Sequence, residues 1–372
     1  MGGFNYLLNL LAGLARFESV RVCPFLFCGD DAPDDDIAAF EAIEGITIIR
    51  SYVFNKKNRR NALFYSLLTG VDLGTVDCFK QNQIDVIFES ATFHGWRLNL
   101  PTIAWFPDLQ HRQMPELFPR MRWFKREIGF RFQLLTGRCI LLSSESARKD
   151  LMRFYPNMAS KTEVLRFPAK INESDLITGP HELLSLYSLP KVFAFLPNQF
   201  WKHKNHAVVI EALGILRKKG LSFTVVATGN PKDHRYPNLY RELEQRMRML
   251  DVAGNFHMLG MVPRSHLIAL LRICTVLINP SRFEGWSTTV EEGKVFGVPM
   301  ILSDLPVHRE QAGNKAVYFA VDDAFQLAAY LESCLNGEQI NPREIQVDSD
   351  LLLKDFACRF ATIVEQIKEE FN

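Results

Sequence analysis

The sequence lacks the features that mark exported, membrane-spanning and nucleic-acid-binding proteins. Its 372 residues carry a formal net charge of only +1, so no overall positive field attracts nucleic acid. No apolar run reaches the length of a transmembrane helix, and the first residues have neither the basic start nor the long apolar core of a secretory signal. We therefore expect a cytoplasmic protein that binds no nucleic acid.

Metal and cofactor motifs are scarce as well. The seven cysteines are scattered, without a CxxC or a zinc spacing, and their odd number predicts reduced thiols. Residues 34–36 and 348–350 have a D-x-D spacing, but each precedes an expected helix, where Asp is a common cap. Neither GxGxxG nor GxxxxGK[ST] is present, which disfavours a dinucleotide site and excludes a P-loop NTPase. We expect no metal ion and no cofactor.

Short apolar runs alternate with amphipathic stretches along most of the chain. This alternation predicts an α/β fold with two Rossmann-like, doubly wound domains whose ligand-binding edges face a central cleft. Expected strands lie at 20–27, 46–50, 84–88, 102–106, 139–144, 192–196, 223–229, 256–260, 275–279, 300–303 and 316–319. The chain is also longer than one core usually holds. We expect domains at 1–172 and 191–350 and a C-terminal helix at 351–372.

Two segments depart from the alternation. Residues 168–190 contain Pro168, Gly179, Pro180 and Pro190 and show no clear period, which predicts an interdomain linker at 173–190. Residues 4–16 have helical spacing and follow Gly2-Gly3, a pair that normally follows a strand in a doubly wound domain. No such strand precedes it, so we expect the first domain to lack its first strand.

The strongest functional signal is the stretch 279–292. The apolar run 275–279 predicts a buried strand, Gly285 lies in a loop, and Thr288 and Glu291 have the spacing of a capping box at a helix start. Such a helix N-terminus favours an anion, and Glu284 and Glu292 flank it. A phosphate site beside paired acids indicates a nucleotide sugar. The alternative is that Glu284 is solvated and that Glu292, in the first turn, only interacts favourably with the helix dipole.

Polar residues follow other expected strands. Lys204 lies between a strand and a helix, where a Lys can reach a phosphate, and Lys202 is a weaker second candidate. The alternative is that Lys204 is a solvated loop residue. Asp108 and His111 follow the strand at 102–106, where a His can act as a base or bind a sugar hydroxyl, or be an ordinary loop residue.

Residues 120–132 mix cations with Trp and Phe at helical spacing, and a basic cluster at 56–60 opens an earlier helix. These segments could lie on an anionic membrane surface, at the inner face of the membrane. The aromatic face could equally pack into its own domain and leave the cations solvated.

Several of these motifs together resemble a known family. Pro280-Ser-Arg-Phe-Glu-Gly-Trp, continuing through Glu292 to Gly297-Val-Pro, resembles the retaining GT-B glycosyltransferases of family 4, which carry an E-x7-E element before G-x-P. Phe195-Leu-Pro-Asn-Gln-Phe-Trp-Lys-His-Lys and Phe106-Pro-Asp-Leu-Gln-His resemble a branch of that family found in bacterial surface-polysaccharide assembly.

The resemblance implies a role for each candidate residue. Glu292 would hold the ribose hydroxyls, Glu284 would lie near the donor sugar, and the backbone at Met261 and Val262 would meet the base. The diphosphate of the donor would be held by Lys204 and the amides of Gly285, Trp286, Ser287 and Thr288. No metal would be required, because Lys204 and the helix dipole would neutralise the leaving group. The C-terminal helix would cross back to the first domain.

The sequence departs from the family pattern at three points. Asn198 stands where the family has a phosphate-binding Arg, unless Lys202 replaces it. Pro107-Asp108 stands where the family has His-Asp, which leaves His111 as a stand-in catalytic residue beside Asp108. The Gly2-Gly3 loop, expected to approach the donor phosphate, stands at the start of the sequence.

Three functions follow from this sequence. The first is a retaining, metal-independent glycosyltransferase that moves a sugar from a nucleoside-diphosphate sugar to a glycan or lipid-linked acceptor in surface-polysaccharide synthesis. The second is a nucleotide-sugar epimerase of the same GT-B fold. The third is a degenerate, non-catalytic glycan-binding protein, which the missing strand and the absent Arg would favour.

Overall fold

The structure, a computed structural model, describes residues 2–90, 92–158, 161–338, 340 and 348–371. The chain divides into two compact units. Unit 1 comprises Met1–Pro168 together with Asp350–Asn372, and unit 2 comprises Ala169–Ser349. Each unit is described separately. No helix in the described ranges combines the length and the apolar character needed to cross a bilayer.

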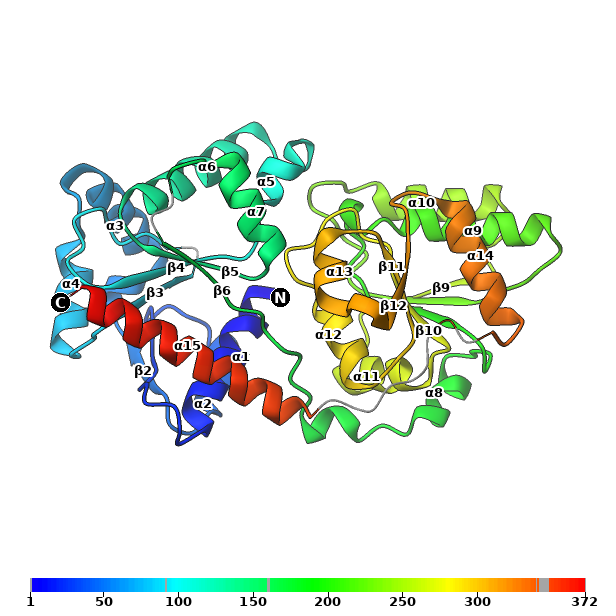
Figure 1. The fold of residues 1–372 in the computed structure, drawn as a ribbon, viewed down its shortest axis with the longest axis horizontal. Helices are drawn as coiled ribbons and strands as arrows, with labels where there is room; N and C mark the ends of the chain where they lie inside the picture. Colours follow the sequence, from blue (N-terminus) through cyan, green and yellow to red (C-terminus); the bar gives the residue numbers. More distant parts are fainter. Residues whose placement is uncertain (1, 91, 159–160, 339, 341–347, 372) are drawn as a thin grey trace. The chain divides into compact units, whose positions relative to one another are not determined.

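Unit 1 contains two parallel sheets. A four-stranded sheet has the order β3-β4-β5-β6, and a separate pair joins β1 to β2 (Figure 1). The strands are β1 (Phe25–Cys28), β2 (Thr47–Arg50), β3 (Ile87–Ser90), β4 (Thr102–Phe106), β5 (Cys139–Leu142) and β6 (Lys161–Val164). The helices are α1 (Gly2–Arg16), α2 (Asp34–Glu41), η1 (Tyr52–Phe54), α3 (Lys56–Thr69), α4 (Leu73–Gln81), α5 (Gln110–Gln113), η2 (Pro115–Leu117), α6 (Arg120–Leu135), α7 (Glu145–Phe154) and α15 (Ser349–Phe371).

The first and last helices of the chain pack together in unit 1. Tyr6 of α1 stacks on Trp105 of β4 with ring centroids 4.0 Å apart and meets Phe356 of α15 edge-on at 5.8 Å. Arg16 at the end of α1 donates two 2.7 Å hydrogen bonds to Asp350 at the start of α15. The C-terminal helix, red in Figure 1, is therefore part of the core of unit 1.

The predicted loop at Gly2-Gly3 is the first turn of α1 instead. A Cβ added to Gly3 would lie 3.6 Å from the ring of Trp105, so this end of the helix packs against β4. Among the described residues no strand precedes α1. The helix expected at residues 4–16 begins two residues earlier and includes both glycines, because packing outweighs their weak helix propensity.

Unit 2 has one parallel sheet with the strand order β12-β11-β10-β7-β8-β9. The chain runs outward from β7 through β8 to β9, and then returns to the other side of β7 for β10, β11 and β12. The strand order therefore reverses between β7 and β10, and in such sheets ligands bind at the carboxyl ends of the strands beside this point. The strands are β7 (Ala194–Leu196), β8 (Val225–Thr228), β9 (Phe256–Gly260), β10 (Val276–Asn279), β11 (Met300–Ser303) and β12 (Ala316–Phe319).

Helices cover both faces of this sheet, as the doubly wound arrangement requires. One apolar cluster includes Leu213 and Leu327, and the other includes Leu183 and Leu270. The helices are η3 (Glu173–Leu176), α8 (Pro180–Leu186), η4 (Lys202–Lys204), α9 (His206–Lys218), α10 (Leu239–Met249), α11 (Arg264–Ile273), α12 (Thr288–Val295), α13 (Pro306–Ala312), η5 (Gly313–Lys315) and α14 (Ala324–Leu335).

The structure differs from the sequence prediction at 173–190. This segment forms η3 and α8 and belongs to unit 2, whose first residue is Ala169. Leu183 is 1% exposed in a cluster with residues of α11, and the Tyr187 hydroxyl lies 2.7 Å from Nδ1 of His266. Gly179 is the N-cap of α8 and Pro180 occupies its first position, so these two residues mark a helix start and do not indicate an unstructured linker.

Candidate functional site

The candidate site lies where the strand order of unit 2 reverses. The loop after β7 leads through Asn198 and Lys204 into α9, and the loop after β10 leads through Glu284 into α12. The two loops are joined across the gap between the strands, because Nδ2 of Asn198 donates a 3.2 Å hydrogen bond to Oδ1 of Asn279. Helices α9 and α12 therefore both begin beside the same strand ends, and the N-terminus of a helix favours an anion.

Lys204 and Glu284 form a buried ion pair in these loops. Nζ of Lys204 donates to Oε1 of Glu284 at 2.6 Å, and the Ser281 hydroxyl lies 2.7 Å from the same oxygen. The two side chains are 13% and 8% exposed. Burial acts to raise the pKa of Glu284, but the Lys204 ammonium and the Ser281 hydroxyl outweigh burial and hold this pKa below its ordinary value. The Glu284 carboxylate is therefore charged at neutral pH.

A hydrogen-bond chain connects this pair to the start of α12. Nδ2 of Asn279 donates to the Ser287 hydroxyl at 2.9 Å, and that hydroxyl accepts from the Val290 amide at 3.4 Å. Ser287 is therefore the N-cap of α12, and Thr288 is the first helical residue. The capping box predicted from Thr288 and Glu291 is wrong.

Glu291 has a different structural role. Its carboxylate accepts from Nζ of Lys294 at 3.0 Å and from Nε2 of Gln311 at 3.0 Å. Gln311, on α13, also accepts from the Ser287 amide at 2.9 Å. Glu291 and Gln311 together fix the first turn of α12 against α13, which the local spacing of a capping box could not indicate.

Asp322 braces both loops of the site from the end of β12. It accepts from Nδ2 of Asn205 at 2.8 Å and from the Arg282 guanidinium, whose Nε lies 2.9 Å from Oδ1. Asn205 adjoins Lys204 in the sequence, and the amide of Arg282 donates to the carbonyl of His203 at 2.8 Å. One carboxylate thus holds the neighbours of both Lys204 and Glu284 in place.

Glu292, the second acid of the predicted pair, has its own cationic partner. It is 3% exposed on α12, and Nη1 of Arg264, the first residue of α11, donates to its Oε1. Arg264 also lies 3.9 Å from Asp175 of η3. Burial raises the pKa of Glu292, Arg264 acts in the opposite direction, and Asp175 adds to the rise.

The remaining residues predicted for the donor lie at the carboxyl ends of the strands of unit 2, with differing exposure. Met261, after β9, is 55% exposed, and Val262 is half-buried. Lys202 is exposed, and its Nζ lies 4.2 Å from the ring centroid of Tyr236, a cation–π contact. Gly285, Trp286 and Thr288 are half-buried. Contacts with a donor stay predictions for all of them.

Three buried histidines surround the ion pair without forming a metal site. Burial lowers the pKa of His203 and His206 to about 3, and the pKa of His308 is lowered for the same reason. Nδ1 of His308 lies 2.8 Å from the carbonyl oxygen of Ser303, so a neutral ring donates there. In the part of the chain that the structure describes, no three His, Cys, Asp or Glu side chains are grouped to hold a metal ion.

In unit 1, the two predicted residues after β4 belong to different clusters. His111, in α5, has no exposed surface, and its Nε2 lies 3.3 Å from Oε2 of Glu127 and 3.2 Å from the Tyr155 hydroxyl. Burial, helped by the Arg126 cation, lowers the pKa of His111 to about 4, so the ring is neutral. Asp108 is partly exposed and accepts from Arg126 at 2.8 Å. A ring without exposed surface favours a structural role, and the catalytic role of His111 stays a prediction.

Sequence reasoning missed Arg264, Asp322 and Gln311. Arg264 and Asp322 follow β9 and β12 closely, at the same carboxyl edge as the residues that were found. Their position after expected strands was therefore an available signal for both. Gln311 lies on α13, a helix that the sequence pattern did not indicate, so nothing in the pattern pointed to it.

The second unit matches a known family model. Residues 186–347 match the model described as Glycosyl transferases group 1. "Putative glycosyltransferase EpsF" of Bacillus subtilis (strain 168) is 29% identical over 115 residues, which are 31% of this chain and 28% of that protein. The chain therefore matches little more than a quarter of the length of this relative.

Solved structures with a similar fold extend over nearly the whole chain. A glycosyltransferase from Rickettsia africae ESF-5 is 16% identical with a TM-score of 0.67, and the match covers 96% of this chain and 94% of the other. Anabaena Alr3699/HepE, solved in complex with UDP, is 14% identical with a TM-score of 0.65, covering 100% of this chain and 94% of the other. These neighbours are GT-B glycosyltransferases, so the fold is GT-B.

Proposed function

We propose that this chain is a retaining glycosyltransferase that moves a sugar from a nucleoside-diphosphate sugar to a glycan or lipid-linked acceptor in surface-polysaccharide synthesis. The observation that carries the proposal is the buried Lys204–Glu284 pair beside two helix N-termini, at the reversal point of the sheet in unit 2. The family match of residues 186–347 and the UDP bound to a structural neighbour support it.

Each charge in the site has a use in such a reaction. An ammonium has three protons, so Lys204 can keep its bond to Glu284 and donate to the leaving diphosphate as well. The amides of Gly285, Trp286 and Thr288, at the start of α12, add donors for the same phosphates. Negative charge on the leaving group is then stabilised without a metal ion, in a site that excludes most water. Asn198 supplies an amide where a cation would otherwise bind phosphate, with Lys202 as the second cation.

The remaining assignments concern the sugar, the nucleoside and the acceptor. Glu284 accepts hydrogen bonds from hydroxyl groups of the donor sugar, and Glu292 accepts hydrogen bonds from the ribose hydroxyls. The backbone at Met261 and Val262 contacts the base. Unit 1 binds the acceptor, with Asp108 as a partly exposed carboxylate and His111 as a neutral ring.

Incubation with nucleotide sugars and glycan acceptors tests the proposal. We expect release of nucleoside diphosphate in step with a longer glycan, detected by mass spectrometry, with the anomeric configuration of the donor retained by NMR. Chelator should leave the rate unchanged. An isomerised donor without any acceptor product would support an epimerase instead, and donor or glycan binding without any turnover would support a non-catalytic binding protein.

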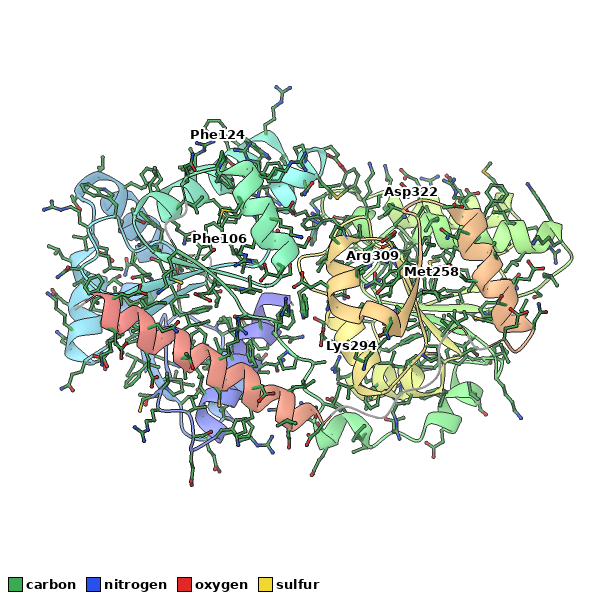
Figure 2. All side chains as sticks on the ribbon, viewed as in Figure 1. Phe106, Phe124, Met258, Lys294, Arg309 and Asp322 are labelled. Carbon is green, nitrogen blue, oxygen red and sulfur yellow. The ribbon has the colours of Figure 1, made fainter. Side chains whose placement is uncertain are left out.

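Helix α6 of unit 1 carries a surface suited to an anionic membrane. Met121, Phe124, Ile128 and Leu135 are exposed along it, and Phe124 is 57% exposed at the outer edge of the unit (Figure 2). The flanking cations Arg120, Arg122 and Lys125 are exposed too. The one acidic residue of α6, Glu127, is buried and paired with Arg112 and Arg131. The side chains of Arg59 and Arg60, in the basic cluster of α3, lie outside the described residues.

We therefore expect the protein to bind vesicles that contain phosphatidylglycerol and not vesicles of phosphatidylcholine alone. Each surface cation contributes about 1 kcal/mol of attraction to such a membrane, so Arg122→Glu should weaken binding at least about fivefold, and Phe124→Ser should weaken it as well. Cosedimentation measures this, with Met249→Ser, which removes an even more exposed apolar side chain from unit 2, as the control. Equal binding of both vesicle types would contradict a role for these cations.

A further inference from the structure

Glu292 is held by a residue that no motif singles out. Arg264 is the first residue of α11, and its guanidinium spans two acidic groups, Glu292 on α12 and Asp175 on η3. Glu292 and Asp175 are both nearly fully buried, whereas the Arg264 side chain is 40% exposed. The guanidinium is thus anchored at its inner side and open to solvent at its outer side.

The two oxygens of the Glu292 carboxylate differ in their surroundings. Oε1 accepts from Nη1 of Arg264. Oε2 accepts no hydrogen bond from the described residues. It is also absent from the set of buried side-chain atoms that have neither a partner nor solvent contact, so this oxygen is open to solvent. A buried carboxylate with one oxygen bound and the other open can accept from a ligand without giving up its internal partner.

The charged partner matters because a carboxylate in this position is costly to ionise. Burial disfavours the charged form, and Asp175 adds like charge from η3. Among the described residues, Arg264 is the one cation that acts on the pKa of Glu292. Asp175 itself is fixed by a reciprocal capping arrangement, in which its carboxylate accepts from the Asn172 amide at 2.9 Å. Asp175 can therefore anchor the second side of the guanidinium.

We infer that Arg264 is a positioning residue for the nucleotide: it holds Oε1 of Glu292 so that the carboxylate stays ionised and presents Oε2 to the ribose hydroxyls of the donor. The inference rests on the ribose-binding role proposed for Glu292. Arg264 acts through Glu292 and need not touch the ligand. Asp175, anchored in η3, fixes the direction from which the guanidinium reaches the carboxylate.

The experiment compares two ligands across variants by calorimetry. The tightest-binding nucleoside diphosphate among UDP, ADP and GDP is titrated against its 2′,3′-dideoxy counterpart. Hydrogen bonds to a charged group are strong, so wild-type protein should prefer the ribose form by about tenfold or more. Arg264→Met should lose this preference at pH 7 and regain it at higher pH, because an uncompensated buried carboxylate ionises only there. Arg264→Lys, which keeps a cation, should retain most of the preference at pH 7.

The control is Arg217→Met, which removes an exposed ion pair with Asp251 from the same unit and should behave like wild type. If wild-type protein binds both ligands equally, the ribose role of Glu292 fails, and the proposed function loses that assignment. If wild-type protein prefers the ribose form but Arg264→Met keeps the full preference at every pH, only the role of Arg264 is overturned. Should Arg264→Met fail to fold, Arg264→Gln, which also lacks the charge, replaces it, and a full ribose preference of that variant at every pH contradicts the inference.

Discussion

Lys204→Met is expected to abolish sugar transfer and to destabilise unit 2 in the same protein. Removing one preorganised group that stabilises developing charge typically costs about 100- to 1,000-fold in rate, and Lys204 is the cation nearest to Glu284. The variant also leaves Glu284 buried without its cation, which typically costs about 3 to 5 kcal/mol of unfolding free energy. Initial rates of nucleoside diphosphate release and denaturant unfolding curves measure the two effects.

A second variant separates the two consequences. Lys204→Met combined with Glu284→Gln removes both charges, so most of the lost stability should return while transfer stays absent. Lys219→Met is the matched control, because it breaks an exposed Lys–Glu pair in the same unit and should change neither quantity appreciably. Wild-type rates in a folded Lys204→Met protein would remove Lys204 from the proposed mechanism. A double variant no more stable than the single one would show that the charge of Glu284 is not the source of the instability.

Arg138→Met should destabilise unit 1 by a similar amount, about 3 to 5 kcal/mol. Arg138 donates to Oε2 of Glu89 at 2.6 Å and to Oε1 at 3.0 Å, and the two side chains are 3% and 0% exposed. The guanidinium also donates to the carbonyl of Gly95 at 2.8 Å. The variant would leave Glu89 charged in the interior and release the loop after β3. Hydrogen exchange of peptides from β3 to β5 locates the loss in unit 1.

Arg148→Met provides the comparison, since Arg148 forms an exposed pair with Glu145 on α7 of the same unit. This variant should change stability by less than about 1 kcal/mol. If both variants unfold at the same denaturant concentration as wild type, the interior pair makes no net contribution to the free energy of unfolding. Such a result would mean that the Gln133 amide and the His94 N–H, which also donate to Glu89, suffice for this carboxylate.

The hydrophobic pattern predicted most of the buried elements and few of the polar ones. The predicted strands at 102–106 and 256–260 agree residue for residue with β4 and β9. The pattern missed β6, whose sequence Lys-Thr-Glu-Val at the edge of its sheet is mostly polar and only partly buried. Edge strands need no apolar alternation, so periodicity cannot find them.

The candidate site was predictable as a set of positions and not as a set of contacts. Lys204 and Glu284 were expected at one edge of a sheet, and the structure joins them by a 2.6 Å hydrogen bond. The partners Arg264 and Asp322 are 28 and 40 residues from the side chains that they hold, Glu292 and Arg282. Pairs so far apart follow from the packing of several elements, and no local spacing encodes them.

The position of α15 in unit 1 has a consequence for synthesis on the ribosome. Arg16 and Asp350 are 334 residues apart in the chain, and unit 2 is formed by the sequence between them. Unit 2 can therefore complete its fold while unit 1 still lacks its last helix. Until α15 arrives, the faces of Tyr6 and Phe88 that it covers stay open to water and to other chains. The aromatic surface beneath α15 is thus exposed during synthesis, and such transiently exposed apolar surfaces are what chaperones protect.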